Sequence, residues 1–514
     1  MPRYLRKGSI LIQQGFDPSK PAEYIDDSAS PNCQNVYVNR GVLTKRNGTT
    51  NFPSAGTLMS GTSKEIMAGR EFEREDTKYN VRIGLDKIEK HNTGTDVWDD
   101  ITGALGDLTG TTDDLIDTAL PILTGDVILV MTNGIDAMRK YDGSTVTLLG
   151  GTPPYPKFIQ EYKTYLVCAN ILGGTDISQR IQWCDTALPE TWTGGNSGAL
   201  DLVEDGEPIT GLNLFGGFVC VHKKGSIYLG TLVSSSDIFR FDRINTQVGT
   251  VANKTIINLP TGEQIFLASD GLRIFNGVTA PPIDSPINAE IRDELHTDYA
   301  HKSWGVLVTE EDEVWIGVPL GDQTTGDTVY KFNYVTRNLY KDVRSNITSA
   351  WRATNIASTT WDDTVGSWDS QTTRWNSGVQ QDNFPFIMLG DNTGLTVKVD
   401  SGVNSDVSTA IDAFWESKDF QHDQQVMSRW KDLRVWATGN SVKVEYSTDS
   451  GVTWVEIGDS PLSLDSAFPP DSDPDILYFD VVSTQIRFRF SNNTAGETFA
   501  LKQFAIGYTP REQR

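Results

Sequence analysis

Seven short apolar runs recur along the chain, each meeting a turn built on Gly, Asn or Asp, and a second strand-like segment usually follows. The runs are Val81–Leu85, Val127–Met131, Tyr165–Ala169, Phe218–His222, Ile265–Ser269, Val314–Val318 and Phe386–Leu389. Their starts are separated by 46, 38, 53, 47, 49 and 72 residues. One four-stranded propeller blade takes about 40–50 residues. The spacing therefore predicts an all-β fold with a divergent β-propeller of about six to eight blades.

The turns between neighbouring strands are short. Asp270-Gly271, for example, separates Ile265–Ser269 from Leu272–Asn276. Parallel strands need a crossover of a dozen or more residues, whereas antiparallel strands can be joined by two. We therefore expect antiparallel sheets throughout.

The chain divides into three predicted parts. Residues 1–60 form an N-terminal segment that joins the propeller and contains one hairpin, in which Arg40-Gly41 separates Asn35–Asn39 from Val42–Arg46. Residues 61–400 form the propeller. Residues 401–514 form a C-terminal β-sandwich, either jelly-roll-like or immunoglobulin-like.

The predicted sandwich rests on six strand-like segments. They are Ala413–Trp415, Leu433–Ala437, Val442–Ser447, Ile476–Phe479, Ile486–Phe490 and Phe504–Tyr508. In the fifth segment, Ile486, Phe488 and Phe490 alternate with Arg487 and Arg489, which predicts one buried and one exposed face.

Two features interrupt the propeller repeat. Ile287, Ile291 and Leu295 share one face of a predicted helix that Ser285 can cap, and this helix is expected to fill a gap between blades or pack at an interface. Residues 351–383 contain a Trp-rich insertion, which we interpret as an ordered loop or a series of turns. Its tryptophans, for which glycan stacking is an alternative, are Trp351, Trp361, Trp368 and Trp375.

The most specific short motif is an Asp-box-like turn. It matches S-x-D-x-G-x-T-W through Ser447, Asp449, Gly451, Thr453 and Trp454. A carboxylate at the second position can accept hydrogen bonds from turn amides, and the glycine can adopt a left-handed conformation. Because this box resembles a structural staple in sialidase propellers, it predicts a hairpin turn and not a catalytic site.

The composition gives no positive sign of an enzyme, a metal site or a cofactor. The five histidines form no HxxxH or HExxH pattern, and Cys33, Cys168, Cys184 and Cys220 show no CxxC spacing. Nucleotide-binding and GxSxG motifs are absent from the sequence. We therefore expect a non-enzymatic protein with no cofactor, although two carboxylates of a generic glycosidase remain an open alternative among 68 acidic residues.

Charge and hydropathy predict the environment of the chain. The formal net charge of −24 disfavours tight binding of nucleic acid or anionic membranes, but permits a conduit through which DNA passes without sticking. No segment has the ~18 consecutive apolar residues of a membrane span, and the N-terminal apolar stretch is too short for a signal peptide. The sequence predicts a soluble protein made in a reducing cytoplasm.

Three stretches resemble the nozzle, or tail-tube, proteins of short-tailed bacteriophages. Asn35–Gly48 resembles their early hairpin N-V-x-V-x-x-G-x-L-x-x-R-x-G, with Asn47 where proline is common. Arg180–Asp185 with Pro189–Trp192, and then Ile209–Gly230, resemble a blade with the pattern R-[IV]-x-[WF]-S-D…P-x-x-W, in which Cys184 replaces the usual serine. The third stretch runs from Asp270-Gly271 through Phe275–Gly277 to Pro286-Ile287.

The resemblance implies a structural virion protein located in the phage tail and made in the host cytoplasm. Such a protein forms a homo-oligomeric ring, expected to be a hexamer, that extends the head-to-tail DNA channel, retains the genome and serves as the conduit for ejection. Its implied partners are adaptor or connector proteins, tail fibres or spikes, and passing double-stranded DNA. The alternatives are a glycan-binding or glycan-cleaving propeller protein and another tail or baseplate scaffold.

Overall fold

Each of the seven apolar runs overlaps the second strand of a separate antiparallel sheet. A second strand is covered on both faces by neighbouring sheets, so its side chains form a continuous apolar run. These strands are β8 (Thr77–Ile83), β14 (Leu129–Thr132), β18 (Tyr165–Ile171), β22 (Phe218–Lys223), β26 (Gln264–Ala268), β29 (Glu313–Val318) and β33 (Phe386–Asp391).

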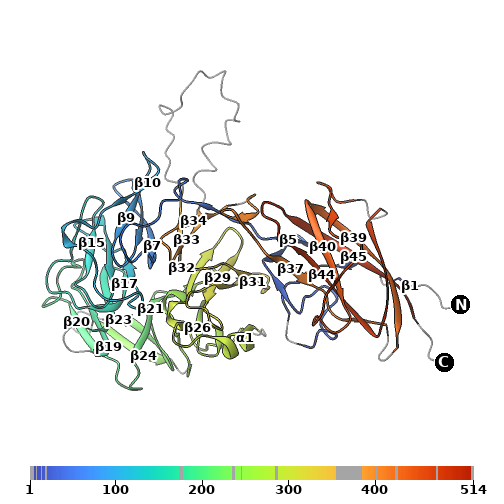
Figure 1. Ribbon diagram of the computed structural model, residues 1–514. Coiled ribbons are helices and arrows are strands. Elements are labelled where there is room, and N and C mark those ends of the chain that lie inside the picture. The colour runs from blue at the N-terminus through green and yellow to red at the C-terminus, as the bar shows by residue number, and fades with distance from the viewer. Residues whose placement is uncertain are drawn as a thin grey trace.

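The computed structural model describes residues 5–6, 8–12, 14–17, 20–172, 177–233, 238–244, 246–283, 287–354, 385–400, 402–422, 426–469 and 473–510. Within these ranges the fold is almost entirely β, as the sequence predicted, with a ring of seven sheets and a two-sheet sandwich side by side (Figure 1).

Blades one to three follow the expected plan of four antiparallel strands. Blade one contains β7 (Ala68–Arg74), β8, β9 (Ile88–Asn92) and β10 (Val97–Asp100). Blade two contains β11 (Asp117–Ala119), β14, β15 (Arg139–Tyr141) and β16 (Val146–Leu148), with a small hairpin of β12 (Ile122–Leu123) and β13 (Asp126–Val127) inserted and a 3-10 turn, η1 (Gly103–Leu105), before it. Blade three contains β17 (Pro156–Tyr162), β18, β19 (Ile177–Trp183) and β20 (Gly198–Asp201).

The remaining blades complete the ring. Blade four contains β21 (Ile209–Phe215), β22, β23 (Ile227–Leu232) and β24 (Phe239–Ile244). Blade five has only β25 (Ile257–Asn258), β26 and β27 (Gly271–Phe275), preceded by the 3-10 turn η2 (Asn253–Thr255). Blade six contains β28 (Trp304–Val308), β29, β30 (Thr328–Asn333) and β31 (Leu339–Val343), preceded by η3 (Ala300–Lys302).

Blade seven closes the ring with strands from two distant parts of the chain. Its strands β32 (Ile347–Ala353), β33 and β34 (Thr396–Val399) pair in order, and β6 (Thr49–Asn51) adds the fourth strand antiparallel to β34. The innermost elements contact one another in sequence around the ring, with β32 against β7 at the join. The ring is therefore closed by the pairing of β6 with β34, whose residues lie about 350 positions apart in the sequence.

Helix α1 (Ile287–Glu294) packs beside β27, where the three-stranded blade five lacks a fourth strand. Ile287 and Ile291 are buried in a cluster shared with blade six, and Leu295 packs against it. The side chain of Asn288 bonds both the amide and the carbonyl of Leu272. The predicted helix and its buried face are confirmed, whereas Ser285 and Pro286 lie outside the described residues.

The C-terminal domain is a sandwich of two mainly antiparallel sheets. The first contains β4 (Val36–Asn39), β5 (Val42–Lys45), β45 (Phe499–Pro510), β39 (Ser428–Gly439) and β43 (Asp475–Ser483), with β1 (Leu5–Arg6) and β2 (Ile10–Leu11) also paired to β45. The second contains β3 (Cys33–Gln34), β37 (Ala413–Glu416), β44 (Gln485–Asn492), β40 (Ser441–Ser447) and β41 (Val455–Glu456), with β38 (Phe420–Gln421) on β44 and β42 (Leu462–Ser463) on β40.

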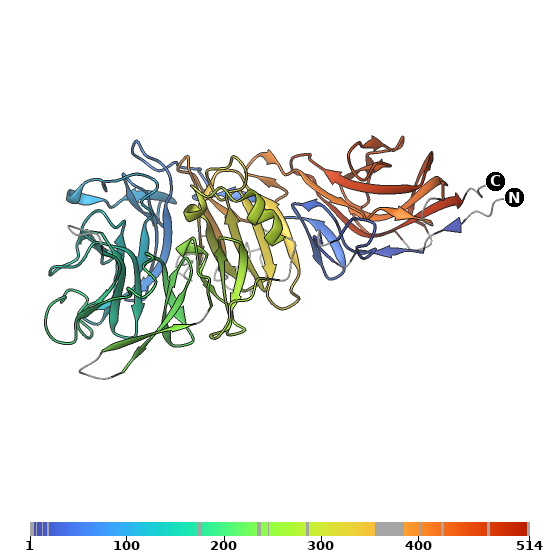
Figure 2. The same ribbon diagram turned by 90° about the horizontal axis from the view of Figure 1, so that it is seen from below.

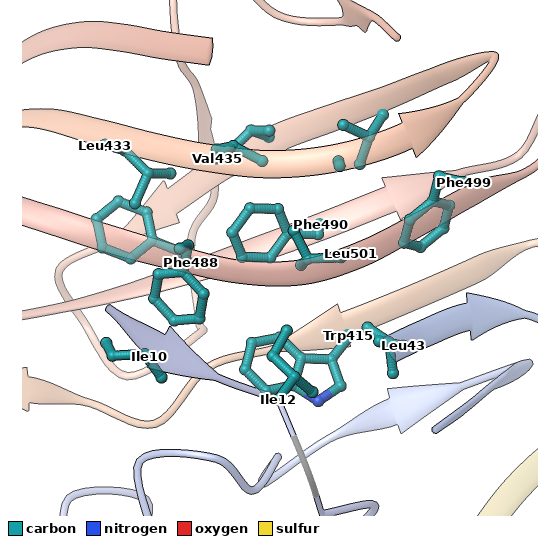
Figure 3. Close-up of a cluster of buried hydrophobic side chains, with 14 of the residues drawn as sticks. Ile10, Ile12, Leu43, Trp415, Leu433, Val435, Phe488, Phe490, Phe499 and Leu501 are labelled. Atoms are coloured by element: carbon teal, nitrogen blue, oxygen red, sulfur yellow. The ribbon is translucent and has the colours of Figure 1, made fainter. Parts of the chain in front are cut away.

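One apolar core lies between the two sandwich sheets. Trp415 and Phe490 of the second sheet face Leu433 and Leu501 of the first, and all four are almost fully buried (Figure 3). Ile10 and Ile12, from the start of the chain, complete this core (Figure 3). Each such side chain gains about 1.5–3 kcal/mol from burial, so the N-terminal segment contributes directly to the stability of the sandwich.

Most of the N-terminal segment belongs to the sandwich and not to the propeller, which differs from the boundary expected at residue 60. Strands β1, β2 and β5 pair with β45, and β3 pairs with β37. They cover sheet edges that would otherwise be unpaired. Only β6 enters the propeller. The short strands β35 (Ser405–Asp406) and β36 (Thr409–Ala410) extend blade seven beyond β6, so the sandwich resumes at β37.

Two residues have environments that differ from their predicted ones. Trp351, expected within the loop-like insertion, lies in β32, buried, and its indole N–H donates to Asn80 Oδ1 at 3.0 Å. Arg487, expected on an exposed face, is buried because Asp419 accepts two hydrogen bonds from its guanidinium and Glu416 accepts a third. Trp361, Trp368 and Trp375 lie outside the described residues.

Candidate functional site: the domain junction and the propeller axis

The β4–β5 hairpin lies at the edge of the first sandwich sheet, on the side that faces blade six (Figure 2). Its turn residues Arg40 and Gly41 have φ values of 51° and 78°, the left-handed pair that a two-residue hairpin requires. This tight turn fixes the register of Val36 opposite Lys45. It thereby sets the position of Arg46, the first residue after β5.

All five donors of the Arg46 guanidinium are used. Two parallel hydrogen bonds reach Asp406, from Nη1 to Oδ1 at 2.9 Å and from Nη2 to Oδ2 at 2.6 Å. The remaining acceptors are Asn35 Oδ1 at 2.8 Å and the carbonyl oxygens of Val343 and Asn47 at 3.0 and 3.1 Å. The Arg46 side chain is 1% exposed. It therefore ties the hairpin, blade six and the extension of blade seven together.

Asn35 also links the two domains by hydrogen bonds. Its backbone N–H donates to Lys341 O at 2.9 Å, and its Oδ1 accepts the Val343 amide at 2.9 Å. On the sandwich side, Nδ2 donates to Asp412 O at 2.7 Å. A φ of 57° places Asn35 in the left-handed region, which asparagine tolerates better than most residues.

A buried charge cluster lies beneath the hairpin. Asp342 is 1% exposed and contacts Lys331 at 2.8 Å and Arg344 at 3.6 Å. Burial alone would raise the pKa of Asp342, but Lys331, Arg46 and Arg344 together hold it below its ordinary value. Burial raises the pKa of nearby Glu313 to about 7 against the attraction of Lys331. Removing one member of such a network leaves a buried charge without its partner and destabilises the folded state.

A cavity of about 400 Å³ lies against this cluster, between blade seven and the sandwich. Its wall includes Arg46, Arg344 and Asp406 from the network, and Asp391 and Asp412 from the two domains. The junction is therefore polar and cross-linked by hydrogen bonds and ion pairs, which favours one fixed orientation of the domains.

The innermost elements of the blades line a polar cavity of about 200 Å³ at the propeller axis. Asp117 accepts hydrogen bonds from the Ile159 amide at 3.0 Å and from Asn253 Nδ2 at 3.2 Å, which link blades two, three and five. Burial raises the pKa of Asp117 to about 6 and lowers that of Lys254 to about 8. Lys254 donates to Met67 O.

The Asp-box-like residues form a turn after β40. Asp449 Oδ1 accepts the Thr453 amide at 2.8 Å and the Ser447 hydroxyl at 2.7 Å, and Gly451 N donates to Ser447 Oγ at 2.9 Å. The Thr453 hydroxyl also donates to Asp449 Oδ2. This bond, followed by those from the Thr453 amide and the Ser447 hydroxyl, lowers the pKa of Asp449 to about 2. Gly451 has a φ of 89°, and Trp454 is half-buried with Arg489 5.6 Å from its ring. The geometry is that of a structural turn.

The sequence pattern predicted the hairpin but not the residues that its Arg46 contacts. Arg46 belongs to the hairpin pattern, whereas Asp342 and Asp406 carry no local signal because they meet it only through the tertiary fold. The four cysteines are free and buried. Among the described residues, no group of three or more His, Cys, Asp or Glu side chains is arranged to hold a metal ion.

No family model matches the sequence, and no curated protein matches it. Two solved structures are similar to this chain at 10% identity each. One is Sqt1 of Saccharomyces cerevisiae, with a TM-score of 0.40 over 78% of this chain and 99% of that chain. The other is PorZ, a surface component of the type-IX secretion system of Porphyromonas gingivalis, with a TM-score of 0.31 over 80% of this chain and 46% of that chain. Neither score supports an argument about activity.

The helices of the described residues include none long and apolar enough to cross a membrane.

Proposed function

We propose that this chain is the nozzle protein of a short-tailed bacteriophage, a structural protein of the virion tail made in the host cytoplasm. About six copies form a ring that extends the head-to-tail channel, retains the packaged genome and conducts DNA during ejection. The ring attaches above to adaptor or connector proteins and outside to tail fibres or spikes. This function requires no chemistry from the chain.

The observation that carries the proposal is the place of the nozzle-like hairpin in the fold. The arginine of its N-V-x-V-x-x-G-x-L-x-x-R-x-G pattern is Arg46, whose guanidinium bonds Asp406 and Val343 O. Its first asparagine is Asn35, which bonds both domains. The resemblance thus falls on the residues that hold propeller and sandwich in one orientation, as a subunit of a rigid ring requires.

The residues of the blade that carry the resemblance are also structural. Trp183 and Trp192 are buried, and the indole of Trp183 donates to Asn196 O at 2.9 Å. Asp185 accepts the Asn196 amide at 2.7 Å. These contacts close the long loop between β19 and β20, so they support an architectural role for the shared pattern.

The charge of the chain fits a conduit for DNA. Six copies carry six times −24 formal charges. A protein that makes few cationic contacts with phosphates releases few counterions, so it has little electrostatic affinity for DNA. DNA can then slide past the ring without being held by its wall.

A phage that carries a nonsense mutation in the gene for this chain provides the test. We expect packaged heads that lose their DNA, and recovery of stable, infectious particles when the wild-type chain is supplied in trans. Particles that lack the chain but keep their genome and infect normally would rule the proposal out.

A further inference from the structure

A cavity of about 620 Å³ opens at the face of the propeller where the innermost strands begin. It adjoins the cavity at the propeller axis, because Asn253 lines both. Its volume falls in the range of small-molecule sites. Its charged and aromatic lining comprises Asp113, Asp114, Lys157, Phe158 and His301, beside which lies the amide of Asn170.

Asn170 has an unusual backbone and an unsatisfied amide. It lies at a bulge in the β18–β19 ladder, between Ala169 and Ile171, with a φ of 59°. Its Nδ2 donates to Ile209 O at 2.7 Å, and since a carbonyl oxygen only accepts, this bond fixes which amide atom faces which way. Oδ1 is left buried without a hydrogen-bond partner, and the residue is only 6% exposed. Strain and an unmet acceptor together point to a binding role.

The neighbouring groups supply complementary polar chemistry. Among the described residues the Lys157 ammonium makes no hydrogen bond or ion pair, so it is an available donor. Asp114 Oδ2 accepts the amide and hydroxyl of Thr111, and its Oδ1 remains an acceptor. Burial lowers the pKa of His301, which therefore presents a neutral ring near pH 7. Phe158 adds a half-buried apolar surface.

We propose that this cavity binds a saccharide. Sugar hydroxyl groups donate and accept, so one ring can provide the donor for Asn170 Oδ1, accept from Lys157 and donate to Asp114. The aliphatic face of the ring can pack on Phe158. Of the two carboxylates in the lining, Asp113 pairs with Lys302 at 2.9 Å, which leaves Asp114 to balance Lys157, so the site does not call for a charged ligand.

An extended peptide is less suited to this place. Peptides that join a sheet pair with an exposed strand edge. The innermost strands pair along one edge only, but the cavity meets β17 and β21 just where they begin, at Lys157-Phe158 and Ile209-Thr210, so it offers no length of free strand edge. A peptide would therefore be held by side chains alone.

Ligand-observed saturation-transfer NMR on the full chain tests the proposal. The probes are methyl α-D-glucopyranoside, N-acetyl-D-glucosamine, D-galactose and L-rhamnose, followed by an array of defined bacterial oligosaccharides. Asn170→Gly removes the amide and suits the positive φ, and Lys157→Ala removes the free ammonium. Lys163→Ala is the matched control, because Lys163 lies at the opposite end of the β17–β18 pair.

We expect saturable binding of at least one saccharide, at least tenfold weaker in each of the two cavity variants and unchanged in Lys163→Ala. The proposal is overturned if no saccharide binds saturably, or if affinity is the same in both cavity variants and the wild type. Binding of a short peptide that no saccharide displaces would also overturn it.

Discussion

Arg46 is the residue through which the two domains are most directly joined, so Arg46→Met should weaken the junction more than any surface change. The variant keeps most of the side-chain volume but removes the five-donor guanidinium. Asp406, 31% exposed, and Asp342, 1% exposed, each lose a cationic neighbour. Breaking a buried pair by removing one partner costs about 3–5 kcal/mol. Because Asp406 can partly rehydrate, we expect about 3 kcal/mol.

Guanidinium chloride unfolding followed by tryptophan fluorescence measures this loss. A chain with two domains need not unfold in one step. With a slope of about 4 kcal/mol per molar for a domain of this size, 3 kcal/mol moves a midpoint by roughly 0.7 M. We expect the transition of Arg46→Met to move by that amount and to separate into two steps, one for each domain.

Two further variants test whether the loss of stability comes from the buried charge network. Arg240, 69% exposed and paired with Asp242, provides the control Arg240→Met, which should change stability by less than about 0.5 kcal/mol. The double change Arg46→Met with Asp406→Leu removes both charges and should recover much of the loss. If Arg46→Met unfolds at the same midpoint as Arg240→Met, the junction does not depend on this network and the reasoning is refuted.

Three further predictions follow from individual contacts. Thr50→Pro removes a backbone amide from the pairing of β6 with β34 and should lower the free energy of unfolding by about 3 kcal/mol, measured by thermal unfolding. Thr50→Val keeps the amide and should not cause a loss of that size. Equal effects of the two changes would contradict the role of β6 in ring closure. Burial lowers the pKa of His222 to about 4, against about 6.5 in the unfolded chain, so the unfolded state binds a proton more readily. The free energy of unfolding is therefore unaffected by His222 above pH 6.5 and falls by about 3 kcal/mol as the pH falls to 4. His222→Gln should remove that part of the pH dependence, and an unchanged pH profile would argue against a buried neutral His222. Gly451→Ala forces a side chain into the left-handed region and should cost about 1–2 kcal/mol, measured as a lower unfolding midpoint than Gly458→Ala, where an added Cβ meets no atom within 4 Å; equal midpoints would contradict the strain argument.

The sequence predicted the repeat because second strands have no solvent-facing side. Val167 and Val219, for example, are fully buried in β18 and β22, and their neighbours in the same strands are apolar too. The outer strands β16 and β20 carry mixed patterns because one of their edges faces solvent. Their short, irregular runs gave no comparable signal.

The pairings that close the molecule could not be predicted from local patterns. β6 and β34 are separated by about 350 residues, and neither carries a sign of the other. The same holds for Arg46 with Asp406 and for the bulge at Asn170. Short segments at the start of the chain therefore looked like one N-terminal unit, although tertiary pairing divides them between the sandwich and the propeller.

Cryo-electron microscopy of intact virions would show where this chain lies. We expect a ring of about six copies below the adaptor, in which each subunit fits a seven-bladed propeller joined rigidly to the sandwich through the β4–β5 hairpin. Virions whose tail contains no density for this chain, or in which it occurs only as isolated copies away from the channel, would rule out the proposed role in the tail.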